Sequence, residues 1–354
     1  MKTLSIDDLK DIVVGATFLG SGGGGSPENG LKLVEEIAKV TKEVKLVSPD
    51  EVPDNEYVAM IAGMGAPKAL KEKGFGPEAL HAFCGLEKLY SMIGVRFKYI
   101  MPGETGGFNS ITPIYVAAIR NLVVVDADGT GGRAVPELGT TLYNLYGLPV
   151  SPFVVADKVG NIVVGWLANP LDGHTAEEIA RHVTVAFGML SGLGTWVVIG
   201  WQVKNFLEPL VLTKSLDVGR ALREAKEKGR DPVKAVLDVV KGYELFRGKV
   251  EKVELRTVAG FDFGRVIVLA SIIYLPLIAA KRPERIREIA TSAIQSLWIS
   301  TSMGLGYVVT ALAPYFNISF AIAIVLFVIG WIMLVYGTYA LLKISRETKV
   351  PLAV

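Results

Sequence analysis

The chain has 354 residues, enough for two or three domains, and its formal net charge of +2 gives no reason to expect a nucleic-acid partner. Its single cysteine excludes an internal disulfide, and its three histidines, with no Cys/His cluster of metal-site spacing, argue against a structural zinc site. Hydrophobic residues make up 51% of the chain, and most of the excess over a typical soluble protein follows Gly264. The first residues lead into an acidic segment with no apolar core, so we expect no secretory signal.

The first glycine-rich stretch, Gly20–Pro27, lies between two predicted helices. Ser5–Asp8 has the pattern of a capping box that opens the first helix, and Leu31–Val40 is amphipathic at helical spacing. The four consecutive glycines between them lose more backbone freedom on folding than any other residue type would. Their N–H groups could bind an anion or a polarised carbonyl at the start of the second helix, or another segment could pass close to them. The stretch has neither the Gly-Lys-Ser/Thr of a Walker loop nor a clean GxGxxG after a strand.

Three short strands in the first half of the chain are each predicted to end in small or polar residues. The strands and the segments that follow them are Tyr57–Ile61 with Ala62–Pro67, Phe97–Ile100 with Met101–Ser110, and Val123–Val125 with Asp126–Glu137. Strands that alternate with helices imply an α/β fold with a mostly parallel sheet and right-handed crossovers. The turns would then share the carboxyl edge of the sheet, so they and the first glycine stretch could converge on one site.

The turn after Val123–Val125 carries the densest group of charged side chains. Asp126 and Asp128 follow the strand, and Arg133 and Glu137 come next, four apart, at the expected start of a helix. Carboxylates crowded at the end of a buried strand are costly unless they have a role. Two interpretations remain open, a structural Asp–Arg network that closes a tight turn and a functional site, and we favour the site.

Residues 139–262 are predicted to form an α+β portion that completes the domain begun by residues 1–138. The expected elements are a hairpin of Val150–Val155 with Asn161–Ala168, a helix at Thr175–Met189, a strand at Thr195–Val203, helices at Leu216–Gly229 and after Asp231-Pro232, and a strand at Lys249–Thr257. His174 stands at a loop-to-helix junction, where it could act as an acid or a base. A surface neighbour of the helix cap is the commoner role for such a histidine.

Residues 263–354 are predicted to form a hydrophobic helical tail. No charged residue occurs from Ile289 to Leu342, and basic residues flank this stretch on both sides. A bilayer core of about 30 Å needs about 20 apolar residues per helix, so we expect a hairpin of two transmembrane helices, or three if Val266–Ala280 also spans. The preceding domain would be cytoplasmic and anchored to the inner or plasma membrane through residues 289–342. A buried helical hairpin in an oligomer core is the alternative.

Across these features, residues 5–262 resemble the S-methyl thiohydantoin desulfurase-like family, formerly a family of unknown function. The matching stretches are Asp8–Gly25, Gly63–Pro67, Gly103-Glu104, Asp126–Gly129, Gly132–Ala134, Pro136-Glu137 and Tyr243–Val250. The resemblance implies a hydrolase of hydantoin-like rings that converts an S-methyl thiohydantoin to a hydantoin and methanethiol. It also implies a hydantoinase- or oxoprolinase-type protein as a partner. The apolar tail departs from the family, which would continue after Arg265 with a polar β-rich domain.

Hydrolysis at the ring carbon that bears sulfur needs an activated water, a stabiliser for negative charge and a proton for the leaving thiol. Our hypothesis makes Asp126 or Asp128 the base, because crowding should raise the pKa of one of them, and Glu104 or Glu137 the acid. The remaining candidates would bind substrate: the backbone amides of Gly22, Gly23, Gly24 and Gly25 as an oxyanion pocket, Arg133 and Asn109 at the ring carbonyls, and Met64 beside them.

Two other functions remain open. In the first, Asp126, Asp128 and Glu137 bind a divalent metal ion in an amidohydrolase-type reaction, although no cofactor is otherwise expected. In the second, the chain is a membrane-anchored ligand-binding or regulatory subunit without catalysis, associated with hydantoin or nucleobase uptake. Further copies of the same chain are the remaining expected partner.

Overall fold

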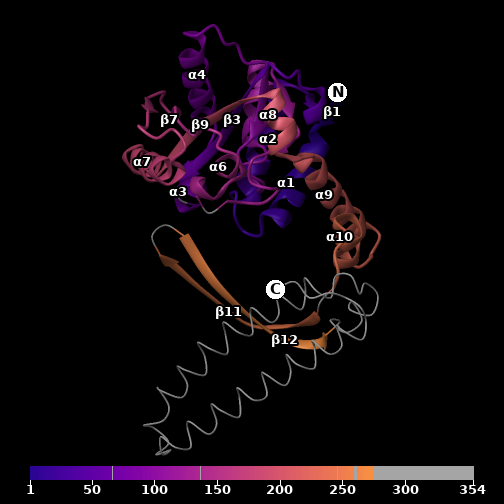
Figure 1. Cartoon of the computed structure of the whole chain (residues 1–354). Coiled ribbons are helices and arrows are strands. Elements are labelled where there is room, and N and C mark those ends of the chain that lie inside the picture. The colour runs from indigo at the N-terminus through magenta and orange to yellow at the C-terminus, as the bar shows by residue number, and fades with distance from the viewer. Residues whose placement is uncertain (66, 136, 245, 259–260, 274–354) are drawn as a thin grey trace, which may run out of the picture. The chain divides into compact units, whose positions relative to one another are not determined.

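The computed structural model describes residues 1–65, 67–135, 137–244, 246–258 and 261–273 (Figure 1). The chain divides into two compact units, Met1–Gly242 and Tyr243–Val354. The predicted membrane spans at 289–342 lie outside the described residues. Within the described ranges, no helix combines the length and the apolar character needed to cross a bilayer.

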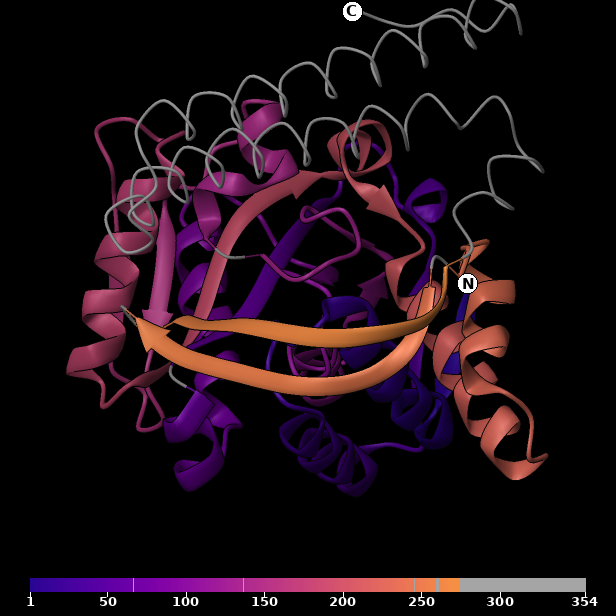
Figure 2. The ribbon, with the colours of Figure 1, turned by 90° about the horizontal axis from the view of Figure 1, so that it is seen from below.

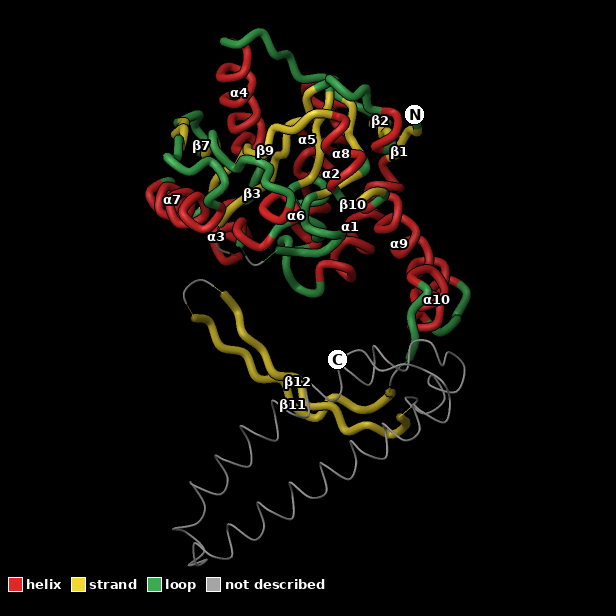
Figure 3. The backbone as a smooth tube through the Cα atoms, viewed as in Figure 1, coloured by secondary structure: helices red, strands yellow, loops and turns green. Residues whose placement is uncertain are grey.

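A mixed eight-stranded sheet organises the first unit (Figure 3). Its strands, in spatial order, are β1 (Lys2–Ser5), β2 (Glu43–Val47), β5 (Val123–Val125), β4 (Tyr99–Pro102), β3 (Tyr57–Gly65), β9 (Leu190–Ile199), β7 (Phe153–Ala156) and β8 (Ile162–Gly165). Strands β2, β5, β4 and β3 run parallel, and the other neighbours in the sheet pair antiparallel. The predicted α/β class is therefore confirmed, with the parallel strands at the centre of a mixed sheet.

The helices largely follow the sequence prediction. They are α1 (Ile6–Gly20), α2 (Pro27–Val40), α3 (Pro67–Lys73), α4 (Pro77–Ser91), α5 (Thr112–Arg120), α6 (Leu142–Leu145), α7 (Gly173–Ala186), α8 (Gly200–Phe206), α9 (Val211–Glu227) and α10 (Pro232–Val240), with 3-10 turns η1 (Pro49–Glu51) and η2 (Leu138–Thr140). The predicted capping box is confirmed, because the Ser5 hydroxyl accepts the Asp8 N–H and the Asp8 carboxylate accepts the Ser5 N–H. Two-residue strands β6 (Ala127–Asp128) and β10 (Glu208–Pro209) pair with each other.

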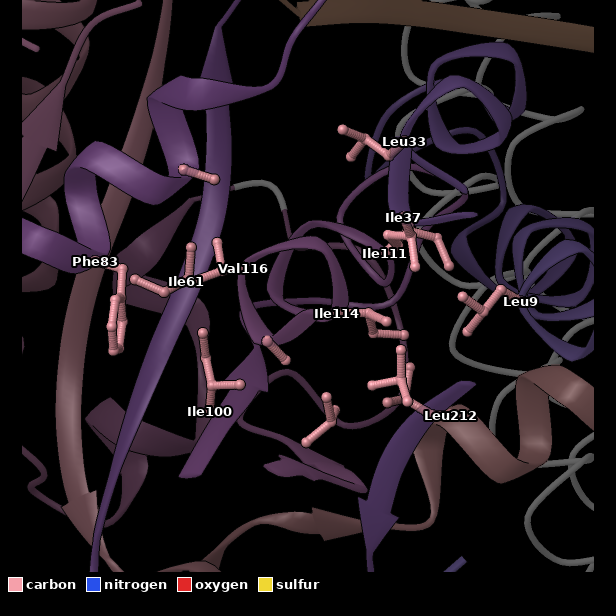
Figure 4. Close-up of a cluster of buried hydrophobic side chains, with 14 of the residues drawn as sticks. Leu9, Leu33, Ile37, Ile61, Phe83, Ile100, Ile111, Ile114, Val116 and Leu212 are labelled. Carbon is pink, nitrogen blue, oxygen red and sulfur yellow. The ribbon is translucent and has the colours of Figure 1, made fainter. Parts of the chain in front are cut away.

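Two apolar clusters pack on opposite faces of the sheet. Along β3, Ala59 and Ile61 belong to the first cluster, whereas Val58 and Met60 belong to the second, as the two-residue period of a strand requires. The first cluster holds side chains of α1, α2, α4, α5 and α9 (Figure 4). The second holds side chains of α6, α7 and α8. Burial of a large aliphatic side chain contributes about 1.5–3 kcal/mol, so both helix layers hold the central strands in place.

Four local predictions were wrong. Strand β3 continues through Ala62–Gly65, which we expected to be a turn, because its glycines allow close approach of other segments: a Cβ on Gly65 would lie 2.4 Å from the Met189 carbonyl oxygen. No helix begins at Arg133, and η2 is the first helical turn after β6. The predicted strand Thr195–Val203 ends at Ile199, where α8 begins. Residues 266–273, expected to start the apolar helical tail, belong to a strand, because a short apolar run alone does not distinguish the two.

The second unit is described as one hairpin. Strands β11 (Phe246–Val258) and β12 (Phe261–Ile273) pair antiparallel along their length (Figure 2). The predicted strand at Lys249–Thr257 is confirmed within β11. The division of the chain at residues 138 and 262 stays a prediction.

Candidate functional site

The glycine-rich segments that we expected to converge do meet in the first unit. The Gly24 carbonyl oxygen accepts hydrogen bonds from the amides of Phe108 (3.2 Å) and Asn109 (2.9 Å). The Asn109 side chain in turn binds Gly63 of β3, accepting from its N–H (2.7 Å) and donating to its carbonyl oxygen (3.2 Å). The Thr105 N–H donates to the Arg133 carbonyl oxygen at 3.1 Å. Four stretches separated in the sequence thus form one hydrogen-bonded assembly.

Close packing explains why the first stretch is rich in glycine. A Cβ on Gly24 would lie 2.5 Å from the Gly106 Cα, and Gly24 also has a left-handed φ of +68°. Of the four consecutive glycines, Gly23 alone has a hydrogen-bonded N–H within the described residues, to the Gly20 carbonyl oxygen at 2.9 Å. The passage of another segment is therefore confirmed as one reason for the glycines, and the oxyanion role of their amides remains a proposal.

Asp126 holds the start of α9. Its side chain is buried and accepts hydrogen bonds from the amides of Leu212 (2.7 Å) and Thr213 (3.2 Å) and from the Thr213 hydroxyl. The first amides of a helix have no partner inside the helix, so this carboxylate satisfies donors that would otherwise be unpaired. Burial raises the pKa of Asp126, and the hydrogen bonds oppose the rise.

Asp128 closes the turn that follows β6. It is completely buried, and one of its carboxylate oxygens accepts the amides of Thr130 and Gly132, each at 3.0 Å. The other oxygen accepts the Thr105 hydroxyl at 3.0 Å. Burial raises the pKa of Asp128, and the donated hydrogen bonds oppose the rise. These bonds fold the chain back at the point where we had expected a helix.

Glu104 lies where the converging segments meet. One of its carboxylate oxygens accepts a hydrogen bond of 2.7 Å from the Asn109 side-chain amide, and the other accepts the Val135 N–H at 2.8 Å. Burial raises the pKa of this carboxyl, the two hydrogen bonds lower it, and the negative charges of Asp128 and Glu177 raise it further. Glu104 is therefore a carboxyl with a raised pKa that is held at both oxygens.

Arg133 and Glu137 do not join the aspartates. The exposed Arg133 guanidinium donates to the carbonyl oxygens of Ala134 (3.0 Å) and Thr140 (3.3 Å), so the Asp–Arg network considered from the sequence does not form. Glu137 lies beside α7, with one carboxylate oxygen 2.9 Å from Nδ1 of His174. Among the described residues, no three His, Cys, Asp or Glu side chains are grouped so as to hold a metal ion. The three proposed metal ligands contact different partners.

Several side chains of this region gave no local signal in the sequence. Thr213 reaches Asp126 across 87 positions, and Glu177 reaches the Leu138 N–H across 39. The sequence did not predict the contact of Thr105 with Asp128, because a hydroxyl residue near glycines is common in loops. Met64 is buried within the second apolar cluster, which favours a packing role for its side chain over contact with substrate.

Comparison with known proteins supports the resemblance seen in the sequence. The family model for the S-Me-THD-like N-terminal domain matches residues 7–165, and that for the S-Me-THD-like C-terminal domain matches residues 171–273. The second match extends past the limit of 262 set by the resemblance, into β12. A crystal structure of a protein from Chromobacterium violaceum is similar, with a TM-score of 0.64 and 28% identity over 76% of this chain and 72% of that chain. No curated protein sequence matches this chain.

Proposed function

The chain belongs to the S-Me-THD-like family, and from this membership we propose that it is a hydrolase of hydantoin-like rings. The proposed reaction adds water to the ring carbon of an S-methyl thiohydantoin and releases a hydantoin and methanethiol. The observation that carries the proposal is Glu104, a carboxyl with a raised pKa at the meeting point of the converging segments. Carboxyls whose pKa is raised by burial are the usual general acids at neutral pH.

Glu104 supplies the proton that the reaction needs first. As water adds to the carbon, the C=N electron pair moves to the ring nitrogen, which takes the Glu104 proton. When the C=O bond forms and the C–S bond breaks, the carboxylate regains a proton from the hydroxyl group. The other proton of the water leaves as the water adds and ends on the sulfur, which gives methanethiol. General acid–base catalysis of this kind contributes about 10²–10⁴-fold to the rate.

The aspartates support this site in the proposal. Both carboxylate oxygens of Asp128 accept hydrogen bonds, and those of Asp126 accept hydrogen bonds from residues of α9. These bonds favour a positioning role for each aspartate over the role of base. Free amides of the glycine stretch remain the proposed stabiliser of negative charge on the ring. Arg133 is exposed and could meet a ring carbonyl at the rim of the site.

Methanethiol release tests the proposal. Full-length protein, extracted in detergent because of its apolar tail, would be incubated with an S-methyl thiohydantoin, and free thiol would be measured over time. Turnover that scales with enzyme concentration supports the proposal. Folded protein that gives no thiol above the uncatalysed rate would overturn it.

A further inference from the structure

A second titratable pair, Glu137 with His174, has no role in the reaction proposed above. Nδ1 of His174 lies 2.9 Å from a carboxylate oxygen of Glu137. With the carboxylate beside Nδ1, Nε2 is the ring nitrogen left to accept a proton when the imidazole is neutral. Nε2 has no hydrogen bond within the described residues, and the His174 side chain is 69% exposed. A carboxylate that orients one nitrogen of an exposed imidazole is the arrangement of a general base.

The imidazole is fixed from a second side. A Cβ on Gly139 would lie 2.6 Å from Cε1 of His174, so the ring rests directly on the Gly139 backbone. Gly173 makes a similar approach possible, because a Cβ there would lie 2.9 Å from the Gly139 Cα. The ring therefore has the Gly139 backbone against it and the Glu137 carboxylate beside its Nδ1.

The pair is connected to Glu104 through a short segment. The Val135 N–H donates to Glu104, and three residues later the Leu138 N–H donates to Glu177 at 3.2 Å. Glu177 follows His174 by one turn of α7, and its charge acts on Glu104. Val135 therefore lies at the Glu104 carboxyl, and Leu138 lies at the helix that carries His174.

We propose that His174, oriented by Glu137, is the general base of this site, an inference that rests on the proposed function. Nε2 takes one proton from the attacking water as its oxygen bonds to the ring carbon. When the C–S bond breaks, its electron pair goes to sulfur, and the imidazolium returns that proton to form methanethiol. With the proton that Glu104 gives to the ring nitrogen and regains from the hydroxyl group, both protons of the water are accounted for.

The test uses full-length His174→Ala with and without added imidazole, and His182→Ala as the matched control. His182 lies on the same helix, but its Nδ1 contacts the Glu178 carbonyl oxygen at 2.7 Å instead of a carboxylate. We expect His174→Ala to lower kcat about 100-fold or more with little change in KM. Free imidazole should restore part of the lost rate in proportion to its concentration, and His182→Ala should keep the wild-type kcat.

The outcomes separate this inference from the proposed function. Wild-type turnover together with an unaffected His174→Ala, or with a loss that imidazole does not reduce, would overturn the role of His174 and leave the hydrolase proposal standing. Absence of methanethiol from the folded wild type would overturn the proposed function and this inference with it. Thermal unfolding of each variant shows whether a loss comes from misfolding.

Discussion

Asn109 and Glu104 are joined by a hydrogen bond of 2.7 Å from the amide nitrogen of one to a carboxylate oxygen of the other. The same asparagine is tied to Gly63 of β3 through both of its polar atoms. Glu104 is therefore held at a fixed distance from a central strand by a side chain that is itself fixed. This preorganisation is what a general acid requires, because a small displacement would cost rate.

Replacement of Glu104 by glutamine should remove the acid. The amide has no proton to give at neutral pH, so we expect kcat to fall about 100-fold or more, with KM changed less. Glu78→Gln is the matched control, since Glu78 is a buried carboxyl that accepts the Gly76 N–H at 2.9 Å. Equal loss in both variants would show a general effect on the fold.

The pH dependence of kcat should report the Glu104 carboxyl. Because its pKa is raised, the acid form persists to higher pH than in an ordinary glutamate, and kcat should fall as the pH rises through that pKa. The Asn109 hydrogen bond stabilises the charged form, so Asn109→Ala should raise the pKa and move the alkaline limb to higher pH. A pH–rate profile for both proteins tests the sign, and a shift to lower pH in the variant would contradict it.

The Asp128→Asn variant distinguishes whether Asp128 positions the turn or acts as the base. The asparagine oxygen can still accept the amides of Thr130 and Gly132. Its NH₂ group can donate to the Thr105 hydroxyl, which then accepts a hydrogen bond where it donates one to Asp128 in the wild type. We therefore expect methanethiol release to continue within about tenfold of wild type, with stability changed by about 1 kcal/mol or less. Loss of turnover in a folded variant would instead make Asp128 the base.

Local signals in the sequence predicted the elements better than the contacts between them. The capping box of Ser5 and Asp8 depends on residues three apart, so the local sequence predicts it directly. The strand Val123–Val125 and the convergence of the turns followed from the βα pattern. The partner of Asp126, by contrast, is Leu212 in the first turn of a helix, 86 positions further on, and no spacing rule connects the two.

Glycine led to a wrong prediction because it occurs both in turns and in strands where another segment packs closely. Gly63 and Gly65 were assigned to a turn, yet they lie in β3, where a side chain would strike Phe108 or the Met189 carbonyl. The charged residues Arg133 and Glu137 stand near the aspartates in sequence, but the Asp128 turn directs them elsewhere. Sequence proximity was a poor guide because one tight turn reverses the chain between them.

Asp126→Ala should destabilise the first unit more than loss of an exposed helix cap would. It leaves the amide of the buried Leu212 and that of the half-buried Thr213 without the carboxylate, which costs about 1–3 kcal/mol, because burial at Leu212 keeps water from replacing it. Asp231→Ala is the control, because Asp231 caps α10 in an exposed position and such a cap contributes about 1 kcal/mol. Urea unfolding measures both, and equal costs would show that Asp126 is no more than an ordinary cap.

The glycine stretch offers a matched pair of substitutions. Gly22 and Gly24 both have left-handed φ values, +99° and +68°, so alanine is strained at either position by roughly 1–2 kcal/mol. A Cβ on Gly22 meets nothing within 4 Å, whereas a Cβ on Gly24 lies 2.5 Å from the Gly106 Cα. Gly24→Ala should therefore separate the first stretch from the Glu104 segment and lower both stability and kcat, while Gly22→Ala should cost stability alone. If the two variants lose stability and turnover equally, the strain at φ explains both losses, and the contact with Gly106 does not position the site.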